Sequence, residues 1–216
     1  MIGDRNVLFM DTFHKDYHAT LKSLSAAFFK SKLQKITQLI KEETLEFIKE
    51  LQTNNIQEID IVELWSTMQS RIFTSVAVGK RNANILVDYE YEDGRIEKWI
   101  FGDVIKNLLA DALNRALKFP FIAFPELLPY TVTPGCMSYK RNVMNTRNAV
   151  QKIMNDRRSG MNKSHFGDSG DLLSILLSDQ LYQGDDEKTK DELIIFFLAG
   201  NETIKTSSTN TVCYLT

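Results

Sequence analysis

The sequence is poor in the residues that build metal centres and disulfide frameworks. Its 216 residues include two cysteines, Cys136 and Cys213, which lie far apart. Zinc ligands come in closely spaced pairs and small disulfide-bonded domains need several cysteines, so both classes are excluded. The three histidines, His14, His18 and His165, show no metal-ligand spacing either. The residues by themselves therefore predict no metal site.

The sequence also lacks an excess of one charge and a long apolar run. The formal net charge is -2 at pH 7, so no global basic field indicates nucleic acid as a partner. No apolar run reaches the length of a membrane span, about 20 residues. Residues Met1 to Arg5 lack the basic start and apolar stretch of a signal peptide. The length suits one domain, or two small ones, with a real core.

Apolar residues recur at helical spacing along most of the chain, which predicts a mainly α-helical fold. Four helices are expected before the prolines: Lys15 to Phe29, Lys32 to Leu51, one capped by Asp60 that ends near Gly79, and one capped by Asp103. Three are expected after them: Ser138 to Arg158, Asp171 to Ser178, and Asp191 onward. Between these, Asn84 to Trp99 carries β-branched and aromatic residues around Asp93-Gly94, which predicts a hairpin or an irregular excursion.

All four prolines lie between Pro120 and Pro134 and forbid regular helix across Phe119 to Gly135. The segment Leu117 to Tyr130 combines three of them with phenylalanine and leucine side chains. Two interpretations are open. The segment is either a buried connector or a loop whose aromatic and apolar content suits contact with a membrane interface.

The final helix changes character in the middle. The apolar run that ends at Ala199 is followed by Gly200, then by Glu202 and Thr203. Glycine costs about 1 kcal/mol against alanine in a helix interior, and threonine can bond back to a carbonyl one turn earlier. The sequence thus gives up helix stability where it turns polar. Either an acid–alcohol pair faces a cavity beside the helix, or small residues allow a close contact with another helix.

The stretch from Ala199 to Thr203, AGNET, resembles the central helix motif of the cytochrome P450 family, Ala/Gly-Gly-x-Asp/Glu-Thr. In that family this helix crosses the face of the heme, and its acid and threonine help deliver protons to iron-bound dioxygen. The resemblance implies that Glu202 is the acid, that Thr203 is the alcohol, and that Ala199 and Gly200 make room for oxygen. Ile204 departs from the usual threonine or serine.

Two further blocks are similar to family segments in the same order. The block that ends at Phe28 is similar to a segment that runs Trp-x-x-x-Arg and ends in Pro-Ala-Phe, whose Trp and Arg hold a heme propionate. Aligned on Phe28, Tyr17 stands at the Trp and Leu21 at the Arg. Leu21 cannot hold a propionate, so Lys22 or His18 is the implied substitute. The second block, Asp171 to Leu177, resembles the Asp-Leu-Leu helix before the central helix.

Other family segments are missing from this sequence. The family needs a later Glu-x-x-Arg helix and a loop of the type Phe-x-x-Gly-x-x-x-Cys-x-Gly. Cys136 has Val132 in the position of that glycine, and Cys213 has Thr209. The last helical pattern also continues to Leu215 without a cap. Residues 1–216 are therefore interpreted as a partial cytochrome P450 domain without the N-terminal anchor region and the C-terminal heme-cysteine half.

The resemblance implies a fragment of a heme monooxygenase that inserts oxygen into a small apolar substrate and receives electrons from a reductase. The complete enzyme would hold heme iron, whereas this chain alone is expected to bind none through a thiolate. The alternative is a noncatalytic helical protein derived from the family, which binds a partner or nothing. In that fragment, apolar surface is expected to be exposed around Phe196, Phe197, Leu198 and Val212.

The resemblance also bears on location and partners. Eukaryotic relatives are associated with the endoplasmic reticulum membrane, and their region matching Leu117 to Tyr130 touches it, although this chain has no transmembrane segment. Its own location stays open. A set of lysines could meet an acidic electron-donor protein or could form a solvated helix face: Lys15, Lys22, Lys30, Lys32 and Lys35.

Overall fold

The structure is a computed structural model that describes residues 6–25, 30–53, 60–79, 82, 84–118, 121, 123–130, 132–160 and 171–215. For Lys30 to Lys32, Pro125, Leu128, Pro129 and Glu202 it describes the backbone alone. The helices are α1 (Tyr17–Ser25), α2 (Lys30–Thr53), α3 (Ile61–Val78), α4 (Phe101–Ala116), α5 (Pro134–Arg158), α6 (Leu172–Ser178) and α7 (Asp186–Leu215). Strands β1 (Leu86–Glu90) and β2 (Ile96–Ile100) form a hairpin, and a 3-10 helix spans Pro125–Tyr130. The expected mainly helical fold with a minor hairpin is confirmed.

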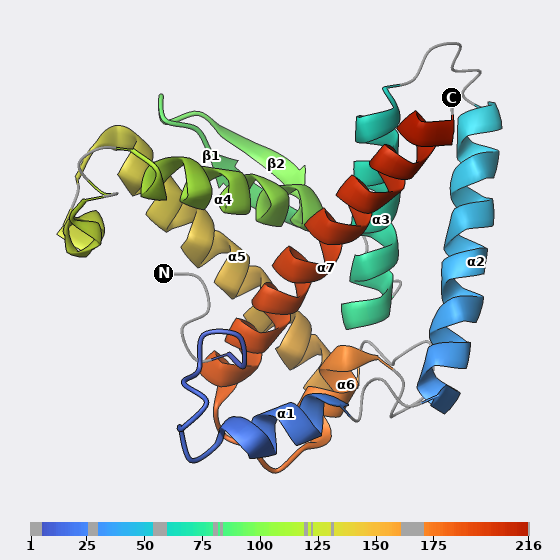
Figure 1. Cartoon of the computed structure of the whole chain (residues 1–216), viewed down its shortest axis with the longest axis horizontal. Helices are drawn as coiled ribbons and strands as arrows, with labels where there is room; N and C mark the ends of the chain where they lie inside the picture. The colour runs from blue at the N-terminus through green and yellow to red at the C-terminus, as the bar shows by residue number, and fades with distance from the viewer. Residues whose placement is uncertain are drawn as a thin grey trace.

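Helix α7 is the element around which the others are arranged. It has 30 residues and runs diagonally through the molecule, with α1 and α6 near its N-terminal end and α3 beside its C-terminal half (Figure 1). The core lies where α7 meets α3 and α4. The ring of Phe197 makes edge-on contacts with Phe101 at 5.0 Å and with Phe73 at 5.6 Å between ring centroids. Such aromatic pairs stabilise a core beyond the area they bury.

Several helix ends follow the local sequence rules. The Asp60 side chain accepts hydrogen bonds from the amides of Val62 and Glu63, as expected of an N-cap. Helix α3 ends at Gly79, whose φ of 93° favours glycine. Asp171 caps α6 by accepting from the Ser174 amide at 2.8 Å. The expected ends at these positions are confirmed.

The expected cap at Asp103 is wrong, because α4 begins two residues earlier. Its N-cap is Ile100, the last residue of β2, and this residue makes no side-chain cap bond. The Phe101 amide instead donates to the carbonyl of Ile85 at 2.9 Å. Strand and helix are thus continuous, and the fully buried Phe101 fixes the junction. Asp103 lies in the first turn, where an acid suits the helix dipole.

Two further helices begin earlier in the chain than their apolar residues predict, because the capping residue precedes the apolar pattern. Helix α7 begins at Asp186 because Asp185 accepts from the Lys188 amide at 3.0 Å. Helix α5 begins at Pro134, in the region expected to be irregular, because Thr133 caps it and a proline lacks only an amide that the first turn leaves unbonded. Helix α1 begins at Tyr17, two residues later than expected. The residues beyond it, 26–29, and most of the expected loop Ser159 to Gly170 lie outside the description.

The hairpin is attached to α5 by asparagine side chains. The strands are antiparallel, with Val87 opposite Trp99. The Asn142 side chain accepts from the Glu90 amide at 2.7 Å and donates to the Glu90 carbonyl at 2.8 Å. Asn145 donates to the Asp88 carbonyl at 2.8 Å. These bonds replace the strand partner that the β1 edge would otherwise need.

Across the described ranges, no helix is both long enough and apolar enough to cross a bilayer.

Candidate functional site

The stretch from Ala199 to Thr203 has an exposed side, at the point where α7 passes from a mostly buried first half to a more exposed second half. Ala199 and Thr203 are both exposed, and they lie one turn apart on the same side of α7. The Thr203 hydroxyl donates to the Ala199 carbonyl at 2.7 Å, which is the back-bonding expected of a threonine in a helix. We call this surface the Ala199–Thr203 face. The backbone of Glu202 belongs to α7, while its side chain lies outside the description.

Gly200 serves a close contact between helices. A Cβ added there would lie 2.1 Å from Cε2 of Phe73, which belongs to α3. The space beside this glycine is therefore filled by an aromatic ring. The two interpretations of the motif thus apply to different residues: Gly200 allows α3 to approach, and the Ala199–Thr203 face stays open.

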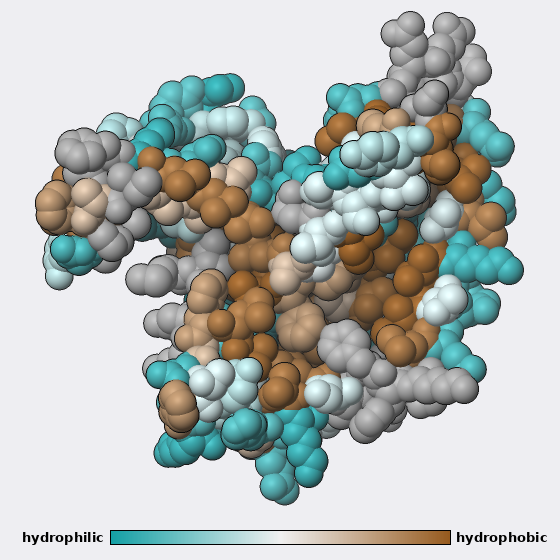
Figure 2. All heavy atoms as spheres, viewed as in Figure 1, coloured by the Kyte–Doolittle hydropathy of each residue, from teal (hydrophilic) through white to brown (hydrophobic). Residues whose placement is uncertain are grey.

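An apolar cavity of about 530 Å³ lies beside the same stretch of α7. It is bounded by α2, α3, α6 and α7, and Figure 2 shows it as a brown hollow between α7 and α2. Ile204 and Phe196 line it from α7, and Ile40, Trp65 and Ile72 are among the residues that face them. Ile204, which departs from the family motif, is therefore part of an apolar surface.

The residues expected to contact a heme propionate lie on α1, which packs near the N-terminal end of α7. Tyr17, His18 and Lys22 belong to α1, and the rings of Tyr17 and His18 meet edge-on with centroids 5.4 Å apart. The next turn of α1 touches the start of α7, where Lys188 donates to the Thr20 hydroxyl at 3.3 Å. Lys188 precedes Thr203 by 15 positions, a rise of about 22 Å along the helix. The described contacts do not bring the two groups of candidate residues together.

The two cysteines lie apart from the Ala199–Thr203 face. Cys136 is buried in the first turn of α5, where the Arg115 guanidinium lies 3.0 Å from its sulfur. Cys213 is exposed near the end of α7. Among the residues that the structure describes, no group of three or more His, Cys, Asp or Glu side chains could hold a metal ion. A heme would therefore find an open helix face here, but no sulfur beside it.

Comparison with known families decides what this arrangement is related to. The family model described as Cytochrome P450 matches residues 3–216. The chain belongs to the cytochrome P450 family. Comparison with curated proteins finds no match for the chain. Members of the cytochrome P450 family in general bind heme, accept electrons from a reductase partner and oxidise apolar substrates.

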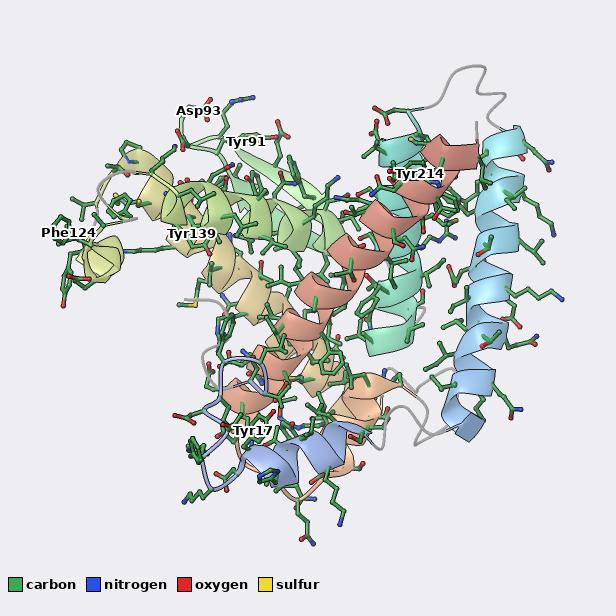
Figure 3. All side chains as sticks on the ribbon, viewed as in Figure 1. Tyr17, Tyr91, Asp93, Phe124, Tyr139 and Tyr214 are labelled. Carbon is green, nitrogen blue, oxygen red and sulfur yellow. The ribbon has the colours of Figure 1, made fainter. Side chains whose placement is uncertain are left out.

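Within this cytochrome P450 domain, the described residues of the segment Leu117 to Tyr130 include several exposed apolar side chains. Leu117 is 68% exposed and Tyr130 is 80% exposed, and Phe124 and Leu127 are exposed as well. Figure 3 places Phe124 at the outer edge, far from α7. The interpretation of a buried connector is therefore wrong for these side chains. Their exposure leaves the segment free to contact another surface.

The apolar residues of α7 are better covered than the sequence suggested. Phe197 is 2% exposed and Leu198 is 7% exposed, because α3 and α4 pack over them, whereas Phe196 and Val212 are partly buried. The expectation that all four leave apolar surface in water is wrong for Phe197 and Leu198. The large apolar side chains of α7 that stay exposed are Ile204, which lines the cavity beside α2, and Tyr214 and Leu215 at its end.

Sequence reasoning missed a buried polar cluster at the start of α7. Tyr182 and Glu192 are both almost fully buried, although neither belongs to a motif of the family. The one signal for Glu192 is its position directly before an apolar run of seven residues, Leu193 to Ala199. An acid at the edge of such a run is carried into the core with it.

Proposed function

We propose that this chain supplies the central helix wall, but not the axial sulfur, of a heme-dependent monooxygenase. The observation that carries the proposal is the Ala199–Thr203 face. It is an exposed strip on the 30-residue helix α7 that carries the Thr203 hydroxyl, while the neighbouring positions Phe197, Leu198 and Asn201 are buried. A flat cofactor can lie only against such a strip.

Each residue of the motif has a distinct part in this proposal. The small side chain of Ala199 keeps the face open. The Thr203 hydroxyl donates to the Ala199 carbonyl. Its oxygen can still accept a hydrogen bond from a group that supplies a proton. Glu202 is the proposed source of that proton, which Thr203 passes toward the face. A bound heme would supply the activation of oxygen.

Anchoring of the heme is proposed to involve α1. Lys22 and His18 are exposed, so each can offer a positive or hydrogen-bonding group to a propionate. Tyr17 lies beside His18 and can add a hydroxyl. Neither cysteine suits the axial position, since Cys136 is buried against Arg115 and Cys213 lies ten residues beyond Thr203 on the same helix. We therefore propose that residues 1–216 form part of a larger cytochrome P450 domain.

A heme-loaded protein that contains this chain allows the proposal to be tested. Thr203→Ala is expected to lower the product formed per electron pair consumed, while heme binding is retained. Thr211→Ala is the matched control, because Thr211 is also exposed on α7 and makes the same bond to a carbonyl four residues earlier, at 2.8 Å. It lies about 80° round the helix from Thr203. Equal coupling in the two variants would contradict the proposed role.

A noncatalytic role is the second candidate, and one observation favours it. The described residues place no sulfur next to the Ala199–Thr203 face. A protein that kept the fold and lost the chemistry would still show the open strip on α7. Substrate turnover by a heme-loaded wild-type protein that contains this chain separates the candidates, because a noncatalytic protein would form no product.

A further inference from the structure

Glu192 is an acid in the core near the start of α7. Its side chain is 0% exposed. One carboxylate oxygen accepts from the Val7 amide at 2.9 Å and lies 3.4 Å from the Tyr182 hydroxyl. The other oxygen is buried and has no hydrogen-bond partner among the described residues. A buried carboxylate with one bare oxygen is costly when it is ionised.

The charged groups around Glu192 do not neutralise it. Lys188, one turn earlier on α7, is 8% exposed, and its ammonium group lies 4.9 Å from the centre of the Tyr182 ring and bonds to Thr20. Asp191, the next neighbour on α7, adds a like charge and pairs with Arg147 of α5. Within the described ranges, no cation lies within ion-pair distance of Glu192. Burial therefore dominates and raises the pKa of Glu192 to about 7.

The segment that covers Glu192 is the one before α1. Asn6 is fully buried, and its side chain accepts from the amides of Leu8 and Phe9 at 3.0 and 3.2 Å, which forms a turn. The Val7 amide of this turn points at Glu192. We call residues 6–16 the N-terminal strap. It is joined to α7 by the bond to Glu192, and its far end leads into α1, which is held by Lys188.

Solvent reaches the neighbourhood of this contact through a second cavity. The cavity has a volume of about 380 Å³ and is lined by Asp11, His14 and Asp16 of the strap and by Asp185 and Lys188 of α7 and the turn before it. Lys188 lies four positions before Glu192, so water in this cavity is one helical turn from the carboxyl group. Opening of the strap would complete the route and hydrate Glu192.

We propose that Glu192 is a protonation-dependent latch that holds the N-terminal strap against α7. The neutral carboxyl group keeps its contact with the Val7 amide and carries no buried charge. Ionisation sends the proton to solvent and leaves a carboxylate that gains hydration only when the strap opens. The folded pKa lies above the ordinary value of 4.5. The latch is therefore fully closed below that ordinary pKa, loosens as the pH rises from there to about 7, and loosens no further once the closed state is ionised as well.

Hydrogen–deuterium exchange of the full chain tests the latch. Between about pH 5 and pH 7, protection of residues 6–16, corrected for intrinsic exchange, is expected to fall by up to about tenfold per pH unit and to level off above about pH 7. Glu192→Gln keeps a neutral group of similar shape, so its protection is expected to be independent of pH. Glu187→Gln is the matched control, because Glu187 is an exposed acid on the same turns of α7. This control is expected to keep the pH dependence of the wild type.

A second variant keeps the test decisive if Glu192→Gln folds poorly. The hydrogen bond from Tyr182 lowers the pKa of Glu192, so Tyr182→Phe is expected to raise the pH at which the fall in protection levels off. Protection of the strap that is constant with pH in the wild type would overturn the proposal. The same pH dependence in Glu192→Gln as in the wild type would also overturn it.

Discussion

Single residues of α7 divide the helix between packing and an open surface. Gly200 is required because the Phe73 ring of α3 occupies the place of a side chain. Thr203, three positions later, points to solvent and bonds back to Ala199. Ile204 turns toward the apolar cavity. One stretch of sequence therefore serves three surfaces, which explains why its motif combines small, acidic, hydroxyl and branched side chains.

Substitution of Gly200 by alanine separates helix propensity from packing. Propensity alone would stabilise the helix by about 1 kcal/mol. The added methyl group would lie 2.1 Å from the Phe73 ring, and overpacking of this kind destabilises a core by about 1–3 kcal/mol. We expect a net loss in urea unfolding. The double variant with Phe73→Leu is expected to recover part of it, and a Gly200→Ala variant more stable than the wild type would contradict the close contact.

At the level of elements, α5 and the hairpin form one unit. Asn142 makes two hydrogen bonds to the backbone of Glu90, and Asn145 makes one to the backbone of Asp88. Arg141 adds an ion pair with the Glu90 side chain. The hairpin is thereby fixed along one edge although it has only two strands. Such a hairpin is marginally stable by itself.

Removal of the Asn142 side chain is expected to loosen the hairpin. Asn142→Ala leaves the partly buried amide and carbonyl of Glu90 without these partners, which costs about 1–3 kcal/mol. Asn145→Ala is the control, because its single bond is exposed to solvent and is replaced by water. Urea unfolding and amide exchange of β1 should show a larger effect for Asn142. Equal effects of the two substitutions would contradict the attachment described above.

The segment Leu117 to Tyr130 is proposed to contact a membrane interface, and this can be measured on vesicles. Replacement of Leu117, Phe124 and Tyr130 together by serine is expected to weaken binding to phospholipid vesicles, because the apolar area available for insertion falls. Leu86→Ser is the control, since Leu86 is an exposed apolar residue on β1. Unchanged vesicle binding in the triple variant would contradict the proposed contact of this segment with a membrane interface.

The sequence predicts elements well where the signal is local. Asp60, Gly79 and Asp171 act within a few residues of the helix end that they mark, so their roles can be read directly. The start of α4 cannot be read from the local sequence, because it depends on the hydrogen bond between Phe101 and Ile85, the residue before β1. The attachment of Asn142 to Glu90 spans 52 residues. Contacts of this range carry no mark in the sequence pattern.

The same distinction holds for the candidate site. Ala199 to Thr203 can be recognised from adjacent letters, and the bond of Thr203 to Ala199 follows from helix geometry alone. The filling of the Gly200 side by Phe73 could not be predicted, since the two residues come from different helices. The burial of Glu192 depends on the strap, which lies 185 residues away at Val7.

On the scale of the whole molecule, α7 connects the N-terminal strap, the Ala199–Thr203 face and the contact with α3. The family match covers residues 3–216, and α3, α4, α5 and α6 all pack against this one helix. Its N-terminal turns meet the strap, its middle carries the Ala199–Thr203 face, and its C-terminal half lies beside α3. The proposal that the chain supplies a helix wall and no axial sulfur follows from this arrangement.

The carbon monoxide spectrum of the reduced chain after addition of hemin tests this claim most directly. Thiolate-ligated heme gives a red-shifted absorption band under these conditions. We predict no such band, because Cys136 is buried against Arg115 and Cys213 lies on α7 without a surrounding loop. A red-shifted band that disappears in Cys136→Ser or in Cys213→Ser would show that this chain supplies the ligand itself, and would contradict the account.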